Sequence, residues 1–281
     1  MKRRLALLIA TLTCAGAAHA GADVRLWHAL DPAMSAQLAR HVADYNARQT
    51  EFRVRLEPLA AAERRSLVRL ALPLNTARPV LYYNRDAFRR AKLNPQLAPK
   101  TWYDMAPVLA RLAEAGIACG YTTASPAWVM LENSGGELSG QLMVRWASML
   151  ASWEKAGYFA YVGRTNEAEQ RFAAGDCALL TASSDIAAEL SRRANFDLGM
   201  APLPYYEDAG VVSHALPASA SAVWVERQSV GVTNFFAYLA ARAAEARARR
   251  EIMESELQAV WRGDKSALDA LEAYARRAAA Q

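Results

Sequence analysis

The chain has 281 residues, of which 33 are basic and 28 acidic, and its formal charge at pH 7 is +5. Three basic residues stand at positions 2–4, so the rest of the chain carries only +2, too little for the electrostatic footprint of a nucleic-acid-binding protein. Beyond residue 20, no segment approaches the about 20 consecutive apolar residues that a membrane-spanning helix needs.

The first 20 residues have the three parts of a secretory signal peptide. A basic start at positions 2–4 is followed by an apolar stretch at 5–12 and by the small-x-small sequence 18–20. We therefore expect cleavage after residue 20 and export of the mature protein out of the cytoplasm. Acylation at Cys14 is the alternative, but Thr13 is a poor fit to the small residue usual before a lipidated cysteine.

The mature chain keeps two cysteines, Cys119 and Cys177. An exported protein is in a compartment where disulfides persist, which favours a bridge between them. In the chain-entropy model, a bridge closing a loop of roughly 60 residues stabilises the fold by about 4 kcal/mol. The alternative is two buried thiols on separate strands.

The start of the mature chain predicts a βαβ unit. Residues 24–27 form a short apolar run typical of a buried strand, and Asp31 with Pro32 marks the start of a helix. A second strand is expected at 52–56. The apolar residues of the helix recur on one face: Met34, Leu38, Val42 and Tyr45.

The rest of the chain continues the alternation of strands and helices, which indicates an α/β protein. Thr101 and Asp104 make a capping box at the start of a helix that ends near Gly116. From Thr233 the chain is almost entirely helical, with a break near Gly263. The other expected strands are 79–83, 117–122 and 177–181, and the other expected helices are 142–155 and 166–174.

Residues 181–185 place two serines where a strand ends and a helical pattern begins. Such a junction offers backbone N–H groups, helix-dipole charge and hydroxyls to a phosphate or carboxylate, with Ser183 and Ser184 as the candidate ligands. A serine in this position is also an ordinary helix N-cap, so the spacing leaves both interpretations open. Trp128 follows a strand in an expected loop at 125–128, where it fits either the C–H face of a polyol or a core position.

No catalytic motif is present. The mature chain lacks GxSxG, HExxH, CxxC and a phosphate-binding glycine loop, and its histidines are His28, His41 and His214. A Cys177 nucleophile would need a histidine base beside it, and a disulfide would abolish it. We therefore predict a protein that is not an enzyme, with no metal and no cofactor, and keep an exported hydrolase as a distant alternative.

Several runs resemble, in order, the sn-glycerol-3-phosphate-binding members of the family 1 extracellular solute-binding proteins. The segment 260–270 (VWRGDKSALDA), before a final helix, is similar to the usual ending of that family. The runs are PVLYYNRDAF at 79–88, PKTWYD at 99–104, IACGY at 117–121, WVMLEN at 128–133, YVGR at 161–164 and GDCALLTASS at 175–184.

The resemblance implies a periplasmic-binding-protein-like type II fold, in which two α/β lobes close over one ligand. We expect a reduced first lobe and a helical C-terminus, because the chain is shorter than members of the family. The implied division is a signal peptide at 1–20, the reduced first lobe with a hinge strand at 21–84, the second lobe at 85–200, a return to the first lobe at 201–230, and C-terminal helices at 231–281.

The resemblance also assigns ligand-binding residues. Ser183 and Trp128 match family positions that contact the ligand, and we add Ser184 and Asn75 as candidates. A second family tryptophan corresponds to Ser125, and alanine replaces contacting residues at 62, 77 and 220. Compared with the family, the chain lacks segments near 66–73 and near 240–251. In the family these segments carry an acidic residue, a tyrosine and a phosphate-binding arginine.

The function implied by the resemblance is that of a periplasmic substrate-binding component of an ABC importer. Its ligand would be sn-glycerol 3-phosphate or a related glycerophosphodiester, and its partners an inner-membrane permease with its ATPase. We expect a monomer that binds no nucleic acid. The lost contacts leave an alternative, a degenerate or repurposed exported remnant that binds no small ligand, since hydrogen bonds and charge pairs worth about 1–3 kcal/mol each are missing.

Overall fold

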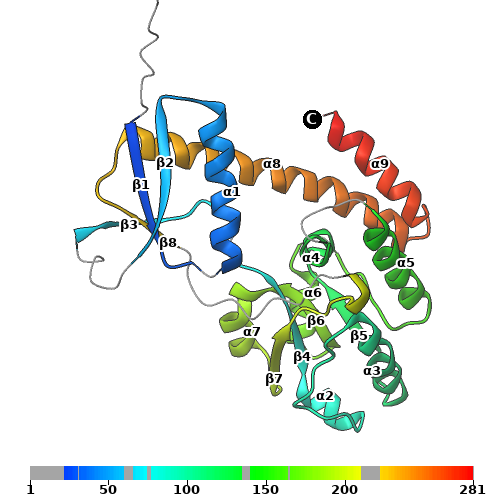
Figure 1. Ribbon diagram of the computed structural model, residues 1–281. Coiled ribbons are helices and arrows are strands. Elements are labelled where there is room, and N and C mark those ends of the chain that lie inside the picture. The colour runs from blue at the N-terminus through cyan, green and yellow to red at the C-terminus, as the bar shows by residue number, and fades with distance from the viewer. Residues whose placement is uncertain are drawn as a thin grey trace, which may run out of the picture. The chain divides into compact units, whose positions relative to one another are not determined.

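The computed structural model describes residues 22–30, 32–59, 66–74, 77–134, 140–163, 165–209 and 222–280 (Figure 1). The chain forms two compact units: unit 1 comprises residues 1–72 and 221–238, and unit 2 comprises residues 73–220 and 239–281. Each unit has its own four-stranded sheet. The predicted signal peptide lies outside the described residues, as does Asn75.

Unit 1 is built on the predicted βαβ unit. β1 (Ala22–His28) and β2 (Phe52–Pro58) run parallel, and α1 (Pro32–Arg48) connects them. Val24 lies opposite Val54, and both are buried against the apolar face of α1. The four residues predicted to form that face are all buried, so the helical pattern was interpreted correctly.

Two short antiparallel strands complete the sheet of unit 1, in the order β2-β1-β8-β3. β8 (Ala222–Val225) lies between β1 and β3 (Val68–Ala71). The chain then enters α8 (Val230–Trp261), where Gly231 lies so close to Val24 and Phe52 that a Cβ atom would be 2.6 Å from each side chain. This close approach fixes a glycine at the start of α8.

The first turns of α8 pack on α1 through aromatic rings. Tyr45 lies 5.1 Å from Phe235 and 5.3 Å from Tyr238, measured between ring centroids. The Tyr238 hydroxyl donates a hydrogen bond of 2.6 Å to Asp44. These contacts bury one side of α1 in a unit whose sheet is small.

Unit 2 has a mixed sheet in the order β5-β6-β4-β7. β5 (Cys119–Thr123) and β6 (Cys177–Ser183) run parallel, whereas β4 (Pro79–Asn84) runs antiparallel to β6 and to β7 (Leu198–Pro202). Every residue of β4 is buried, as its continuous apolar run predicts. The sequence division placed β4 in the first lobe, but both of its partners belong to the sheet of unit 2.

Helices cover both faces of this sheet. On one face, α6 and α7 bury a cluster that includes Tyr82, Phe172 and Leu190. The predicted capping box at Thr101 and Asp104 starts α3 and is confirmed. The helices of unit 2 are α2 (Arg85–Arg90), α3 (Trp102–Glu114), α4 (Pro126–Asn133), α5 (Gln141–Lys155), α6 (Glu167–Ala173), α7 (Ala187–Arg193), the end of α8, and α9 (Ala267–Ala279).

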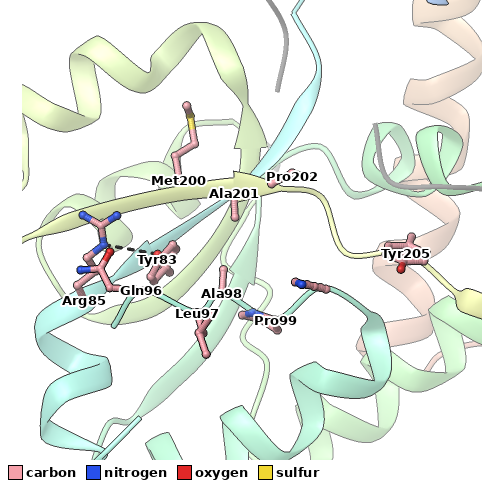
Figure 2. A pocket seen from close by; sticks show the side chains of 11 residues that line it. Tyr83, Arg85, Gln96, Leu97, Ala98, Pro99, Met200, Ala201, Pro202 and Tyr205 are labelled. Carbon is pink, nitrogen blue, oxygen red and sulfur yellow. Dashed lines mark hydrogen bonds between the residues drawn. The ribbon is translucent and has the colours of Figure 1, made fainter. Parts of the chain in front are cut away.

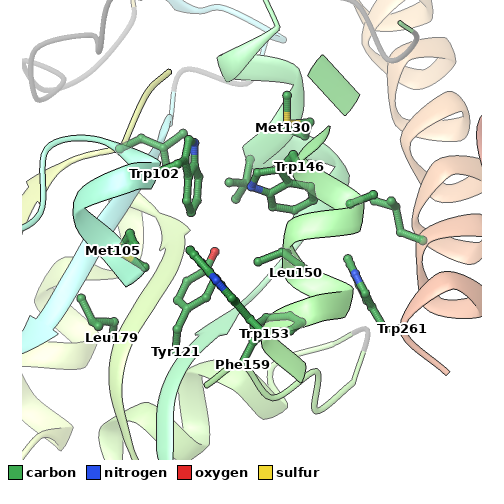
Figure 3. Packing of buried hydrophobic residues seen from close by; sticks show 14 of the residues in the cluster. Trp102, Met105, Tyr121, Met130, Trp146, Leu150, Trp153, Phe159, Leu179 and Trp261 are labelled. Carbon is green, nitrogen blue, oxygen red and sulfur yellow. The ribbon is translucent and has the colours of Figure 1, made fainter. Parts of the chain in front are cut away.

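The other face carries a core rich in tryptophan (Figure 3). Trp102 of α3 lies 6.0 Å from Trp146 of α5 and 6.2 Å from Tyr121 of β5, between ring centroids. Trp261, at the end of α8, lies 6.3 Å from Trp146. The C-terminal helices are therefore part of the core of unit 2. Within the described ranges, no helix is both long and apolar enough to cross a bilayer.

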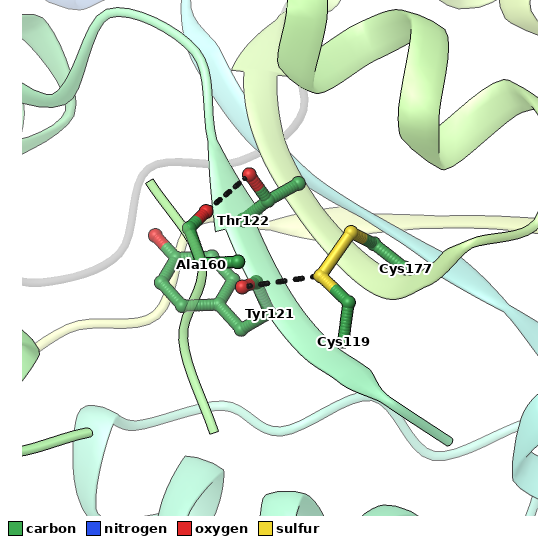
Figure 4. Close-up of a disulfide and its surroundings, with 5 residues drawn as sticks. All are labelled: Cys119, Tyr121, Thr122, Ala160 and Cys177. Carbon is green, nitrogen blue, oxygen red and sulfur yellow. Dashed lines mark hydrogen bonds between the residues drawn. A yellow bond between two sulfur atoms is a disulfide. The ribbon is translucent and has the colours of Figure 1, made fainter. Parts of the chain in front are cut away.

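The predicted disulfide is present (Figure 4). Cys119 and Cys177 lie opposite each other in the register of β5 and β6, with their Cα atoms 4.5 Å apart. Both residues are buried. The bridge therefore joins two neighbouring strands at the end where they enter the sheet.

We predict that the double substitution Cys119→Ala and Cys177→Ala lowers the free energy of unfolding by up to about 4 kcal/mol, because the unfolded chain gains the entropy of the opened loop. Guanidinium unfolding of the oxidised, reduced and substituted proteins measures this. The reduced wild type should match the double variant, and thiol titration of the oxidised protein without residues 1–20 should find no free thiol. A reactive thiol there would contradict the bridge and favour the hydrolase alternative.

A buried carboxylate connects the last two helices. Glu256 of α8 is only 4% exposed. Its side chain accepts hydrogen bonds from Lys265 and, at 2.7 Å, from Arg277 of α9. Burial alone would raise the pKa of Glu256, but these two cations outweigh it and hold the pKa below its usual value.

We predict that Glu256→Gln destabilises unit 2 by about 1–2 kcal/mol, because both cations keep access to water and lose only their shared partner. Since the folded pKa is lowered, the contribution is complete above pH 4.5, the ordinary value, and is lost as the pH falls below it. Thermal unfolding at pH 7 and pH 3 measures both effects. The matched control is Glu272→Gln, which removes an exposed ion pair to Arg276 on α9 and should change stability by less than about 0.5 kcal/mol.

Candidate functional site

The candidate site lies at one edge of the sheet in unit 2. Because β5 and β6 are parallel, with Thr123 opposite Thr181, both strands end at this edge. Pro79 lies opposite Ser183, which brings the start of β4 to the same place. The edge therefore gathers α4, the turn after β6, and the residues that precede β4.

Ser183 is the last residue of β6 and is half-buried. Its carbonyl oxygen accepts a hydrogen bond of 2.8 Å from the Tyr82 hydroxyl. Its own hydroxyl caps no helix and has no hydrogen-bond partner among the residues that the structure describes. The backbone is thus fixed while the hydroxyl is left for another acceptor or donor.

Ser184 makes two hydrogen bonds to the backbone of Arg78. Its hydroxyl accepts a hydrogen bond of 3.1 Å from the N–H of Arg78, and its N–H donates one of 2.8 Å to the carbonyl of Arg78. These bonds extend the pairing of β4 and β6 by one residue. Ser184 therefore joins the end of β6 to the residue before β4, and its hydroxyl oxygen serves as an acceptor within the protein.

The helix predicted after Ser183 does not begin directly at that residue. A three-residue 3-10 turn at 184–186 comes first, and α7 that follows has only seven residues. The N–H of Ala187 donates to the carbonyl of Ser184, and the N–H of Ser184 donates to the carbonyl of Arg78, so two backbone N–H groups of this junction are engaged within the protein.

Trp128 lies in the first turn of α4, not in a loop as predicted. Ser125, exposed and in the left-handed backbone region with φ of 53°, starts this turn, and its carbonyl accepts the N–H of Trp128 at 3.0 Å. The indole is half-buried and stacks on no other aromatic ring in the described part of unit 2. It remains available as an apolar surface.

A carboxylate that was not expected from the sequence binds the backbone at the start of α4. Glu254 of α8 accepts a hydrogen bond of 2.9 Å from the N–H of Ala127. One turn earlier, Arg250 is partly buried, and this burial lowers its pKa. Because Glu254 is 127 positions from Ala127 in the chain, no local pattern connects the two residues.

A second missed residue, Arg78, brings a cation to the edge. It is half-buried, and its pairing with Ser184 places it one residue before β4. The resemblance places the phosphate-binding arginine of the family in the missing segment near 240–251. Residue 78 gives no sequence signal, because a basic residue before a strand is common.

A chain of hydroxyls lies behind the edge. The Tyr121 hydroxyl and Thr181 Oγ1 are 2.8 Å apart, and Thr181 donates a hydrogen bond of 2.7 Å to Thr123 Oγ1. All three residues are fully buried, and burial raises the pKa of Tyr121. These hydroxyls satisfy one another and are structural. Nowhere in the described ranges do three His, Cys, Asp or Glu side chains form a group suited to a metal ion.

We predict opposite outcomes for the two serines. Ser184→Ala should lower the free energy of unfolding by about 1 kcal/mol, because the Arg78 N–H loses its acceptor. Ser183→Ala should leave stability within about 0.5 kcal/mol, because its hydroxyl has no partner to lose. Thermal unfolding of both variants measures the difference. Equal destabilisation would show that Ser183 is structural as well.

Comparison with known proteins gives a family match over most of the chain. A family model described as bacterial extracellular solute-binding protein matches residues 18–246. The sn-glycerol-3-phosphate-binding periplasmic protein UgpB of Shigella flexneri serotype 5b is 35% identical over 61% of this chain, and UgpB of Escherichia coli K12 is 34% identical over the same share. The aligned part spans only 45% of the length of each relative.

Solved structures share the fold at low sequence identity. UgpB from Mycobacterium tuberculosis, in complex with glycerophosphocholine, has a TM-score of 0.54 and 16% identity, covering 92% of this chain and 98% of that chain. The cyclic alpha-maltosyl-1,6-maltose binding protein from Arthrobacter globiformis has a TM-score of 0.53 and 15% identity, with the same coverage. The predicted two-lobed α/β fold of the solute-binding proteins is confirmed.

Proposed function

Because this chain belongs to the bacterial extracellular solute-binding protein family, we propose that it binds a small phosphorylated polyol outside the cytoplasm, in the periplasm. The ligand class is sn-glycerol 3-phosphate or a related glycerophosphodiester. In this role the protein delivers the solute to an inner-membrane permease driven by an ATPase. It acts by binding and not by catalysis.

The proposal depends on which polar groups at the sheet edge are already hydrogen-bonded within the protein. Ser184 and the N–H of Ala127 are engaged within the protein, whereas the Ser183 hydroxyl and the Trp128 indole have no partner among the residues that the structure describes. These two side chains are the two that match ligand-contacting positions in the family. A hydroxyl and an indole suit the hydroxyl groups and the C–H face of a polyol.

The phosphate needs positive charge, and Arg78, one residue before β4, is a candidate for it because its backbone pairs with Ser184 at these strand ends. A guanidinium can hold two phosphate oxygens at once, so one arginine can replace several neutral donors. The carboxylate of Glu254 at the start of α4 works against an anion there. We therefore place the phosphate near the strand ends and the polyol near Trp128.

Isothermal titration with sn-glycerol 3-phosphate, glycerophosphocholine and glycerol tests the proposal. We predict binding of at least one phosphorylated ligand, and no binding of glycerol, because only the phosphate uses the charge at the edge. Ser183→Ala and Trp128→Ala should each weaken binding about tenfold, the equivalent of one lost hydrogen bond or ring contact.

The matched control is Ser152→Ala on α5, whose hydroxyl bonds only the carbonyl of Ser148 on an exposed surface. It should leave the affinity unchanged. A wild-type protein that is folded and gives no heat with any phosphorylated ligand at millimolar concentration would contradict the proposal. That result would favour the alternative of a remnant without a small ligand.

A further inference from the structure

Unit 2 has a pocket beside β7, the last strand of its sheet (Figure 2). Its volume is about 530 Å³, within the range of ligand-binding pockets. It lies between β7 and the segment 96–100 that leads into α3. Its lining includes Tyr83, Leu97, Pro99, Lys100, Met200 and Pro202.

The pocket is closed at one end and open along its length. At the closed end, the N–H of Trp102 donates to the carbonyl of Tyr205 at 3.0 Å, and the N–H of Tyr205 donates to the carbonyl of Lys100 at 3.3 Å. Farther from this bridge, residues 96–100 make no backbone hydrogen bond to β7 in the described structure. The two segments thus form a wedge with the pocket between them.

The ring of Tyr83 forms one wall of the wedge. It lies across Gly199 of β7, so close that a Cβ atom there would be 2.3 Å from the ring. The Tyr83 hydroxyl donates to the carbonyl of Pro95 at 3.2 Å. It also accepts a hydrogen bond of 3.5 Å from Nε of Arg85 (Figure 2). The wall is therefore fixed before any ligand enters.

The outer edge of β7 carries backbone groups that have no hydrogen-bond partner among the residues that the structure describes. The N–H of Arg85 donates to the carbonyl of Asp197, and antiparallel alternation then directs residues 199 and 201 toward β4. The N–H and C=O groups of Leu198 and Met200 point away from the sheet. The opposite edge differs: β5 is covered by the segment 158–160, through hydrogen bonds of 2.9 Å between Tyr121 and its backbone.

The surroundings of this edge are basic and apolar. Residues 85–100 contain five Lys and Arg but only one Asp. Arg85 and Arg89 share Asp197, whereas the ammonium group of Lys100 forms no ion pair with any residue that the structure describes. Leu97 is 63% exposed and Met200 40% exposed. An acidic partner with apolar side chains matches both features.

We infer that the outer edge of β7 binds an extended peptide segment of a partner protein, which pairs as an added strand. Its backbone groups meet those of Leu198 and Met200, its apolar side chains enter the pocket, and its carboxylates approach Lys100. A compact small anion would use the charge but leave the row of backbone groups unpaired, so an extended peptide uses more of the site. This surface is separate from the polyol site of the proposed function.

Fluorescence anisotropy with the full mature chain tests the inference. The probe is a labelled synthetic peptide of alternating Glu and Val residues, and its controls are the same peptide with Lys in place of Glu and one N-methylated on alternate residues. We expect the acidic peptide to bind at least tenfold more tightly than either control, and its affinity to fall as salt rises from 50 to 500 mM, about the range over which screening removes exposed charge pairs.

Two variants separate the edge from the pocket. Met200→Pro removes an outward N–H without removing a bond to β4, and should weaken binding at least tenfold, whereas Met200→Ala keeps the N–H and should weaken it less. Equal binding of the N-methylated peptide would overturn strand pairing and assign the pocket to a ligand held by side chains alone. Equal binding of the Lys peptide, or none by any peptide at 1 mM, would also overturn the inference. If Met200→Pro fails to fold, the N-methylated peptide decides.

Discussion

The parallel pairing of β5 and β6 is the constraint on which the candidate site depends. It makes both strands end at one edge, and so brings the start of α4 next to the turn after β6, although Thr123 and Thr181 at the ends of the pairing are 58 positions apart in the chain. Parallel strands need a connection of about a dozen residues or more. Three interactions hold the pairing: the Cys119–Cys177 bridge at one end, the hydroxyl chain through Thr181 near the other end, and the antiparallel neighbour β4 on the far side. Each is buried, so the geometry of the edge is set by the core of unit 2.

Several polar groups at this edge form hydrogen bonds within the protein. Ser184 closes the sheet against Arg78, and Glu254 satisfies the start of α4, so two groups suited to an anion are engaged internally. The Ser183 hydroxyl and the Trp128 indole have no such partner among the residues that the structure describes. Since each neutral hydrogen bond contributes only about 1 kcal/mol, the proposed binding of a phosphate also needs a charged group such as Arg78.

The sequence predicted the features that depend on local pattern. The βαβ unit, the capping box at Thr101, the disulfide and the two C-terminal helices follow from periodicity, capping chemistry and cysteine count, and all are present. Short elements were missed: β3 has four residues that are mostly exposed, so it lacks a burial pattern. The roles of Ser184 and Glu254 were missed because each is set by a partner more than 100 positions away.

The two outer strands of the sheet in unit 2, β5 and β7, differ in how far their backbone is covered by other segments. At β5, the chain returns through 158–160, and its backbone pairs with both the N–H and the C=O of Tyr121. At β7, the bridge at Tyr205 is the protection found among the described residues, and the segment 96–100 diverges from the strand. Soluble proteins commonly protect an open edge with charge, and the five basic residues of 85–100 fit that role. The same charge that repels a second copy of this edge attracts an acidic strand, so protection and selective recognition follow from one arrangement of residues.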